Sequence, residues 1–172
     1  MNKNVFNVKN LVTFSMLVAI QIILTRFLSV QAWNFRIGFG FVPIVFASMY
    51  LGMVPAVLIA CVSDILGCFL FSPFPYMPGY TLSVGLTAVI YSLCLEKSRS
   101  QYRIILAIII SQLLCSLIIN SYLLTLSTGS PLLPLMQFRV LQVLINSILQ
   151  YFAINAIVML FEKRKIFHAI AK

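Results

Sequence analysis

Long apolar segments, separated by short polar or proline-rich breaks, run through almost the whole chain. A helix needs about 20 residues to cross a hydrocarbon core of roughly 30 Å, so each long segment is a candidate crossing. The breaks leave six such segments. We therefore predict six transmembrane helices, at about residues 11–30, 38–51, 54–71, 80–95, 104–126 and 135–161.

Prolines, glycines and polar residues account for the breaks between these helices. The stretch from Ile37 to Tyr80 is too long for one crossing, and Gly52 and Pro55 divide it into a short helix and a longer one. Three prolines within residues 72–79 exclude a continuous helix there. The polar residues 96–103 and the Thr-Gly-Ser-Pro sequence at 128–131 mark two further loops.

Composition places the chain in the membrane. Its 172 residues are 62% hydrophobic and 9% charged, with a mean hydropathy of +1.06. A soluble domain carries roughly a quarter charged residues, so three acids could not cover a water-facing surface. A soluble enzyme, a disordered chain and a disulfide-stapled secreted domain are excluded. We predict one all-α integral membrane domain over residues 1–172.

The basic residues indicate the orientation. The net charge of +9 does not indicate nucleic-acid binding, because a basic face needs a folded soluble surface. With the N-terminus inside, nine of the twelve Lys and Arg residues fall on the cytoplasmic side, as the positive-inside rule expects. A five-helix arrangement would put the basic residues 163–165 outside. We therefore expect both termini in the cytoplasm and a multi-pass protein of the cell membrane.

Three arginines depart from this rule. Arg26, Arg36 and Arg139 all fall near the outer surface in the six-helix arrangement. An arginine within the membrane costs on the order of 2.5–3.5 kcal/mol and usually faces a cavity or a ligand path. Alternatively, Arg36 is simply a loop residue and the other two extend to lipid headgroups. Because the outer half holds so little acid, the excess charge suits an anionic ligand, such as one with two carboxylates.

Asp64 is the one carboxylate in the outer or middle part of the chain. It lies about halfway along the third predicted helix, near mid-membrane. It could pair with an arginine. It could equally accept hydrogen bonds from the N–H groups of a heterocycle in an apolar pocket.

Polar and aromatic side chains add further candidates. Arg139, Gln142, Asn146 and Gln150 share one face of the sixth predicted helix, either to line a cavity or to bond a neighbouring helix such as the one with Asn120 and Ser121. Aromatic residues gather at the outer end, as an interfacial belt or to stack on a flat ligand. Phe41 and Tyr80 are among these aromatic candidates.

No catalytic or metal-binding pattern accompanies them. The chain has no P-loop, HExxH or GxSxG sequence. Its four cysteines lie in apolar runs without CxxC spacing, which is typical of small packing residues. We expect neither an enzyme nor a bound cofactor or metal.

Three segments resemble characteristic segments of one group of membrane proteins. The run Arg36-Ile37-Gly38-Phe39-Gly40-Phe41-Val42-Pro43-Ile44 is similar to the start of that group's second helix. Ser63-Asp64-Ile65-Leu66-Gly67, followed by Phe69-Leu70-Phe71, resembles its Ala-Asp-x-x-Gly-x-x-x-Phe segment. Pro78-Gly79-Tyr80-Thr81-Leu82-Ser83 resembles its Pro-Gly-Phe-Thr-Leu-Ser signature. The order of these segments holds over about residues 10–160. On these motifs the chain resembles the folate type of substrate-binding S components of energy-coupling factor (ECF) vitamin transporters.

The resemblance implies an ABC-type importer subunit that binds folate, or a reduced folate, from outside. Such a subunit has no ATPase of its own and associates with a transmembrane coupling subunit and two cytoplasmic ATPases. Folate has a pterin ring and a glutamate with two carboxylates. The resemblance therefore assigns Arg26, Arg36 and Arg139 to the carboxylate end and Asp64 to the pterin.

The coupling subunit packs on an Ala-x-x-x-Ala pattern in such proteins, and the match here is Ser15-x-x-x-Ala19. On an ideal helix Arg26 lies only about 20° from Ser15 in azimuth, so one face would serve both pocket and partner. Either the helix bends, the contacts lie at different depths, or one assignment fails. An S component for another anionic vitamin, and a structural membrane protein of rod-shape morphogenesis, remain alternatives.

Overall fold

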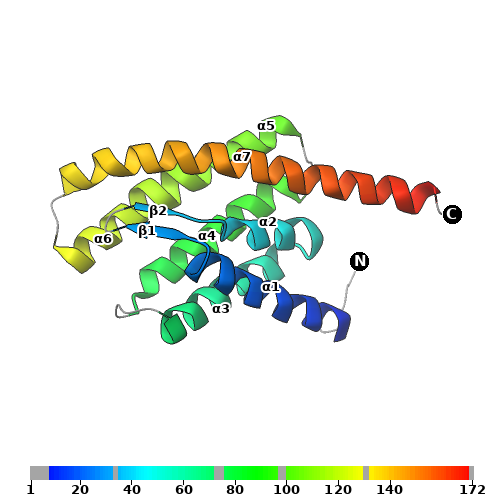
Figure 1. Cartoon of the computed structure of the whole chain (residues 1–172), viewed down its shortest axis with the longest axis horizontal. Coiled ribbons are helices and arrows are strands. Elements are labelled where there is room, and N and C mark those ends of the chain that lie inside the picture. Colours follow the sequence, from blue (N-terminus) through cyan, green and yellow to red (C-terminus); the bar gives the residue numbers. More distant parts are fainter. Residues whose placement is uncertain (1–7, 33–34, 72–75, 97–99, 130–131, 171–172) are drawn as a thin grey trace.

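The computed structural model describes residues 8–32, 35–71, 76–96, 100–129 and 132–170. For residues 8–10, 30–32, 35–37, 128, 132–135, 138 and 160–170 it describes the backbone alone. Within these ranges the chain forms six helical rods, as predicted, and α1 begins at the same end of the bundle at which α7 ends (Figure 1).

The first rod, α1 (Val8–Arg26), is followed by a short hairpin that the all-helical prediction lacked. Strand β1 (Val30–Ala32) pairs antiparallel with β2 (Phe35–Ile37), with Gln31 opposite Arg36. The prediction extended the first helix to residue 30, and this boundary is wrong. Residues 31–37 fell between two predicted helices and were expected as a loop, although the β-branched and aromatic residues among them favour strands.

A tight turn joins the next two helices, α2 (Phe41–Tyr50) and α3 (Met53–Phe71). The backbone N–H groups of Leu51 and Gly52 both donate to the carbonyl of Ala47, at 2.8 and 3.2 Å. Gly52 has φ of +94°, which favours glycine over any residue with a side chain. The predicted break at this glycine is confirmed.

The remaining rods are longer. Helix α4 (Pro78–Leu95) begins with proline at its first position, where a missing N–H costs nothing. Helices α5 (Gln101–Ile110), η1 (Ser111–Ile119) and α6 (Asn120–Thr128) follow one another without a break and form the fifth rod. The middle part, η1, is a π-helix, in which each N–H bonds a carbonyl five residues back. Helix α7 (Leu132–Ile170) is 39 residues long, about 58 Å at 1.5 Å per residue.

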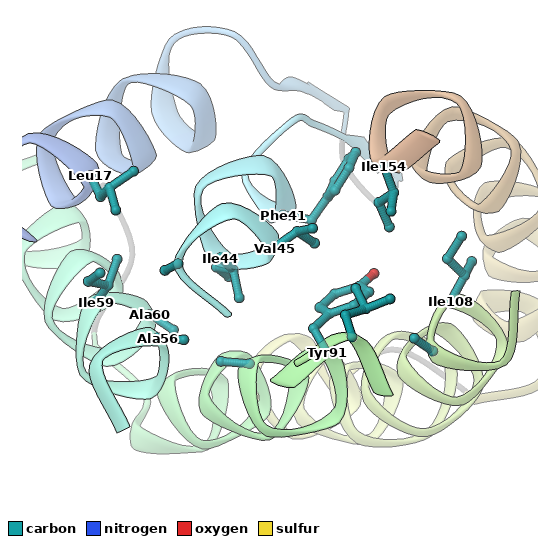
Figure 2. Close-up of a cluster of buried hydrophobic side chains, with 14 of the residues drawn as sticks. Leu17, Phe41, Ile44, Val45, Ala56, Ile59, Ala60, Tyr91, Ile108 and Ile154 are labelled. Carbon is teal, nitrogen blue, oxygen red and sulfur yellow. The ribbon is translucent and has the colours of Figure 1, made fainter. Parts of the chain in front are cut away.

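Helix α2 lies at the centre of the core. Phe41, Ile44 and Val45 are buried, and Figure 2 shows them between Leu17 of α1 on one side and Tyr91 of α4 on the other. Among the described residues many large apolar side chains are exposed on the outside of the bundle. In the described part of the chain four helical spans are long and apolar enough to cross a membrane, and Leu11–Arg26 and Phe41–Tyr50 are shorter apolar helices. The outer surface is therefore suited to lipid.

Candidate ligand-binding site

A cavity of about 220 Å³ lies between α1, α2, α3, α4, η1 and α7. Most of the residues that line it are polar, although the surrounding helices are apolar. Three sets of polar residues spaced four apart line it: Gln21, Thr25 and Ser29; Gln112, Ser116 and Asn120; and Gln142, Asn146 and Gln150. Residues four apart on an α-helix share a face, so α1 and α7 each present a polar stripe to the cavity. Ser29, just beyond α1, extends the first stripe, and polar residues of the fifth rod line the same space.

Sequence analysis recognised the stripe on α7 and missed the other two. The predicted members Gln142, Asn146 and Gln150 line the cavity, which is one of the two roles expected for this stripe. Asn120 of the neighbouring rod lines the same cavity. Gln21 and Thr25 show the same spacing in an apolar helix. That spacing was the available signal for the missed residues.

Asp64 of α3 is the one charged side chain among the described residues that line the cavity. Its Oδ2 atom accepts a hydrogen bond of 2.8 Å from the Thr81 hydroxyl of α4. Tyr76 Oη lies 3.0 Å from the Thr81 oxygen, and because the Thr81 proton points to Asp64, the Tyr76 hydroxyl is the donor. This chain of hydrogen bonds fixes the carboxylate at the cavity wall.

Besides Asp64, two oxygen atoms in the wall are available as acceptors, because they are buried without a hydrogen-bond partner among the described residues. They are Gln21 Oε1 on α1 and Asn120 Oδ1 on α6. Buried polar atoms are normally paired, so unpaired acceptors in a cavity wall are suited to a ligand that carries N–H or O–H donors. Together with Asp64 they make the cavity rich in acceptors.

The floor of the cavity is a buried hydrogen-bonded cluster. Tyr91 of α4, which is fully buried, donates from Oη to Gln150 Oε1 at 3.0 Å. Ser111 Oγ lies 3.2 Å from the same Tyr91 oxygen. Because its carbonyl oxygen is held by Tyr91, the Gln150 amide is fixed at the cavity surface.

The segment between β2 and α2 closes the cavity against the end of α1. A Cβ at Gly38 would lie 2.8 Å from the Ser29 Cβ, and one at Gly40 would overlap the Thr25 side chain. Only glycine allows this approach of the backbone. The Gly-x-Gly pair of the sequence therefore brings the start of α2, with Phe41, into the wall.

The predicted arginines have a different placement from Asp64. Arg26 Nη2 donates to the Cys68 sulfur of α3 at 3.0 Å, and its guanidinium packs on Gly67. Arg139 Nη1 lies 3.1 Å from the Ser116 carbonyl oxygen and 3.3 Å from Ser121 Oγ. Neither arginine is among the described lining residues, and their buried Nε atoms have no partner among the described residues. The side chain of Arg36 lies outside the described part.

The other predicted site residues divide into two groups. Phe41 and Gln142 line the cavity, whereas the half-buried Tyr80 of α4 does not do so. Ser15 and Ala19 are exposed on α1. Within the described residues no three His, Cys, Asp or Glu side chains gather as a metal site.

Comparison with known proteins identifies the family. The sequence model described as "ECF transporter, substrate-specific component" matches residues 9–169. The chain belongs to this family. It is thus a membrane-embedded component of a transporter and not an enzyme.

Two relatives and one solved structure bear the same name. The folate transporter FolT of Clostridium novyi (strain NT) is 37% identical over 108 residues, 62% of this chain and 63% of that protein. FolT of Leuconostoc mesenteroides subsp. mesenteroides is 29% identical over 52% of this chain and 48% of its own. A crystal structure of FolT bound with folic acid has a TM-score of 0.77 and 27% identity, covering 87% of this chain and 95% of that one. The chain thus spans less than two thirds of the curated relatives in these matches.

Proposed function

We propose that this ECF substrate-specific component captures folate, or a reduced folate, from outside the cell membrane and delivers it across with an ATP-driven coupling module. The observation that carries the proposal is the acceptor-rich cavity around Asp64. A pterin ring presents several N–H donors in one plane, which complement a carboxylate and unpaired amide oxygens. The names of the relatives and of the structural neighbour support the same ligand.

The proposed ligand enters with the pterin deepest. Its N–H groups bond to Asp64, Phe41 packs on the ring, and the Gln142 amide contacts a ring edge. The glutamate carboxylates then lie toward the predicted cations Arg26 and Arg36. Arg139 and Tyr80 were predicted for the ligand as well, and both lie on elements that border the cavity.

The proposed partners are a transmembrane coupling subunit and two ATPase subunits. The ATPase subunits hydrolyse ATP, for which this sequence has no P-loop motif. Ser15 and Ala19 are exposed on α1, as a docking surface requires. Arg26 instead faces α3. Eleven residues separate Ser15 from Arg26, about 16 Å along the helix, so different depths allow both assignments.

Calorimetry on the purified protein in detergent tests the ligand. We expect folate to bind, and p-aminobenzoylglutamate, which lacks the pterin, to bind far more weakly. Asp64→Asn should weaken folate binding at least tenfold, because hydrogen bonds to a charged group contribute about 1.5–3 kcal/mol. Glu96→Gln is the matched control, since Glu96 is exposed outside the cavity.

Two results would contradict the proposal. If wild type and Asp64→Asn bind folate with equal affinity, the Asp64 carboxylate does not bind the ligand. If the folded wild-type protein does not bind folate, the assignment of folate as the ligand is wrong, and other anionic vitamins would then be tested. If the protein binds no vitamin and substitution of its outer arginines leaves function intact, the structural morphogenesis role is favoured.

A further inference from the structure

The π-helical segment of the fifth rod faces the cavity. Four of its nine residues line the wall: Ser111, Gln112, Cys115 and Ser116. Asn120, the first residue of α6, lines it too. π-Helical turns are rare, and they occur frequently at functional sites because the extra residue redirects side chains.

The return from π-helix to α-helix leaves one carbonyl over. The N–H of Asn120 bonds the Cys115 carbonyl, five residues back. In the α-helical pattern that follows, the next N–H reaches four residues back, to residue 117. The change of pattern skips the carbonyl of Ser116, which then needs a donor from outside the helix.

Arg139 of α7 supplies that donor. Its Nη1 lies 3.1 Å from the Ser116 carbonyl oxygen and 3.3 Å from the Ser121 hydroxyl, so one nitrogen bridges both sides of the transition. Arg139 is half-buried, and its Nη1 gives the skipped carbonyl a hydrogen-bond donor. This contact favours the π-helical pattern, because without it the carbonyl would be unpaired in an apolar bundle.

We propose that Arg139 is a positioning residue that holds η1 in its π-helical form, and that it affects the ligand through Gln112, Ser116 and Asn120 rather than by binding its carboxylates. The inference deepens the proposed function and depends on it only for the identity of the ligand. The role of Arg139 in η1 concerns the ligand-free protein and stands on the contacts above.

The experiment combines hydrogen exchange with a truncated ligand. Arg139→Met keeps the length of the side chain and removes its donors and charge. Arg103→Met is the control, because Arg103 is exposed on α5. In the ligand-free protein we expect amide exchange across residues 111–121 to rise at least tenfold in Arg139→Met and to stay unchanged in the control. Exchange in α4 should not change in either.

Calorimetry then compares folate with 6-hydroxymethylpterin, which has the pterin ring and carries no carboxylate. If Arg139 positions η1, Arg139→Met weakens both ligands by the same factor, expected to be about tenfold. If the loss occurs with folate alone and exchange is unchanged, Arg139 binds the carboxylates and the inference is overturned. Unchanged exchange with unchanged affinities overturns it as well.

A milder variant covers a failure of Arg139→Met to fold. Ser121→Ala removes the second acceptor of Arg139 Nη1 and keeps the charge. We expect a two- to fivefold rise in exchange across residues 111–121, and no rise would contradict the inference. A wild type that binds no folate would refute the proposed ligand, and the exchange result would still decide the role of Arg139.

Discussion

Removing the hydroxyl of Tyr91 should destabilise the protein although the aromatic ring remains. Tyr91 is fully buried, and its Oη donates to Gln150 Oε1 at 3.0 Å. Tyr91→Phe deletes this donor and leaves the glutamine oxygen unpaired at the base of the cavity. Ser111 is less affected, because its hydroxyl also lies 3.0 Å from the Ile108 carbonyl oxygen.

The expected cost follows from these contacts. A net hydrogen bond contributes about 0.5–1.5 kcal/mol, and a buried acceptor left unsatisfied costs about 1–3 kcal/mol. Gln150 borders the cavity, and water there can replace part of the lost bond. We therefore expect the free energy of unfolding to fall by about 1–2 kcal/mol, which corresponds to a fall in Tm of about 4 °C for a domain of this size.

Equilibrium unfolding in mixed detergent micelles, followed by tryptophan fluorescence, measures this change. Tyr102→Phe is the matched control, because Tyr102 is 72% exposed on α5. Its effect should stay within about 0.5 kcal/mol. If Tyr91→Phe unfolds like the control, the buried cluster does not stabilise the cavity floor and the reasoning is wrong.

Three further variants test other parts of the structure. Gly40→Ala should lower the free energy of unfolding and weaken ligand binding, because its Cβ would overlap the Thr25 side chain; unchanged binding in calorimetry would contradict this packing. Gly52→Ala should lower thermal stability by about 1–2 kcal/mol, because a side chain is strained at φ of +94°, and a Tm equal to wild type would contradict it. Ser15→Leu combined with Ala19→Leu should abolish uptake in cells that express the coupling module and leave ligand affinity intact; uptake at the wild-type rate would remove this face from partner binding.

The helices of this chain could be predicted because lipid and sequence impose the same pattern. Runs of apolar residues and the breaks between them placed the third rod within one residue of α3 (Met53–Phe71). The hairpin was missed because residues 31–37 lie between two predicted helices, and polar residues in so short a segment were interpreted as a loop. β2 packs against α7, which no local pattern reveals.

The site was predicted in part, for a related reason. Asp64 and Gln142 are polar residues in apolar helices, and their cost in the membrane marks them as functional. The π-helical turn has no such signal, because residues 104–126 form one apolar run and the change of hydrogen bonding depends on Arg139 from another rod. The complete cavity wall is therefore apparent only in the three-dimensional structure.

The shortness of α2 explains why there is room for a ligand at all. Ten residues span about 15 Å, half of a hydrocarbon core of roughly 30 Å. A full-length helix at this place would need some ten more residues, and its missing turns would occupy the bundle next to the first residue of α2, where Gly38, Gly40 and Phe41 border the cavity. The protein thus obtains its binding volume by omitting half a helix from a packed bundle, and the start of the shortened helix, at Gly40 and Phe41, becomes part of the cavity wall.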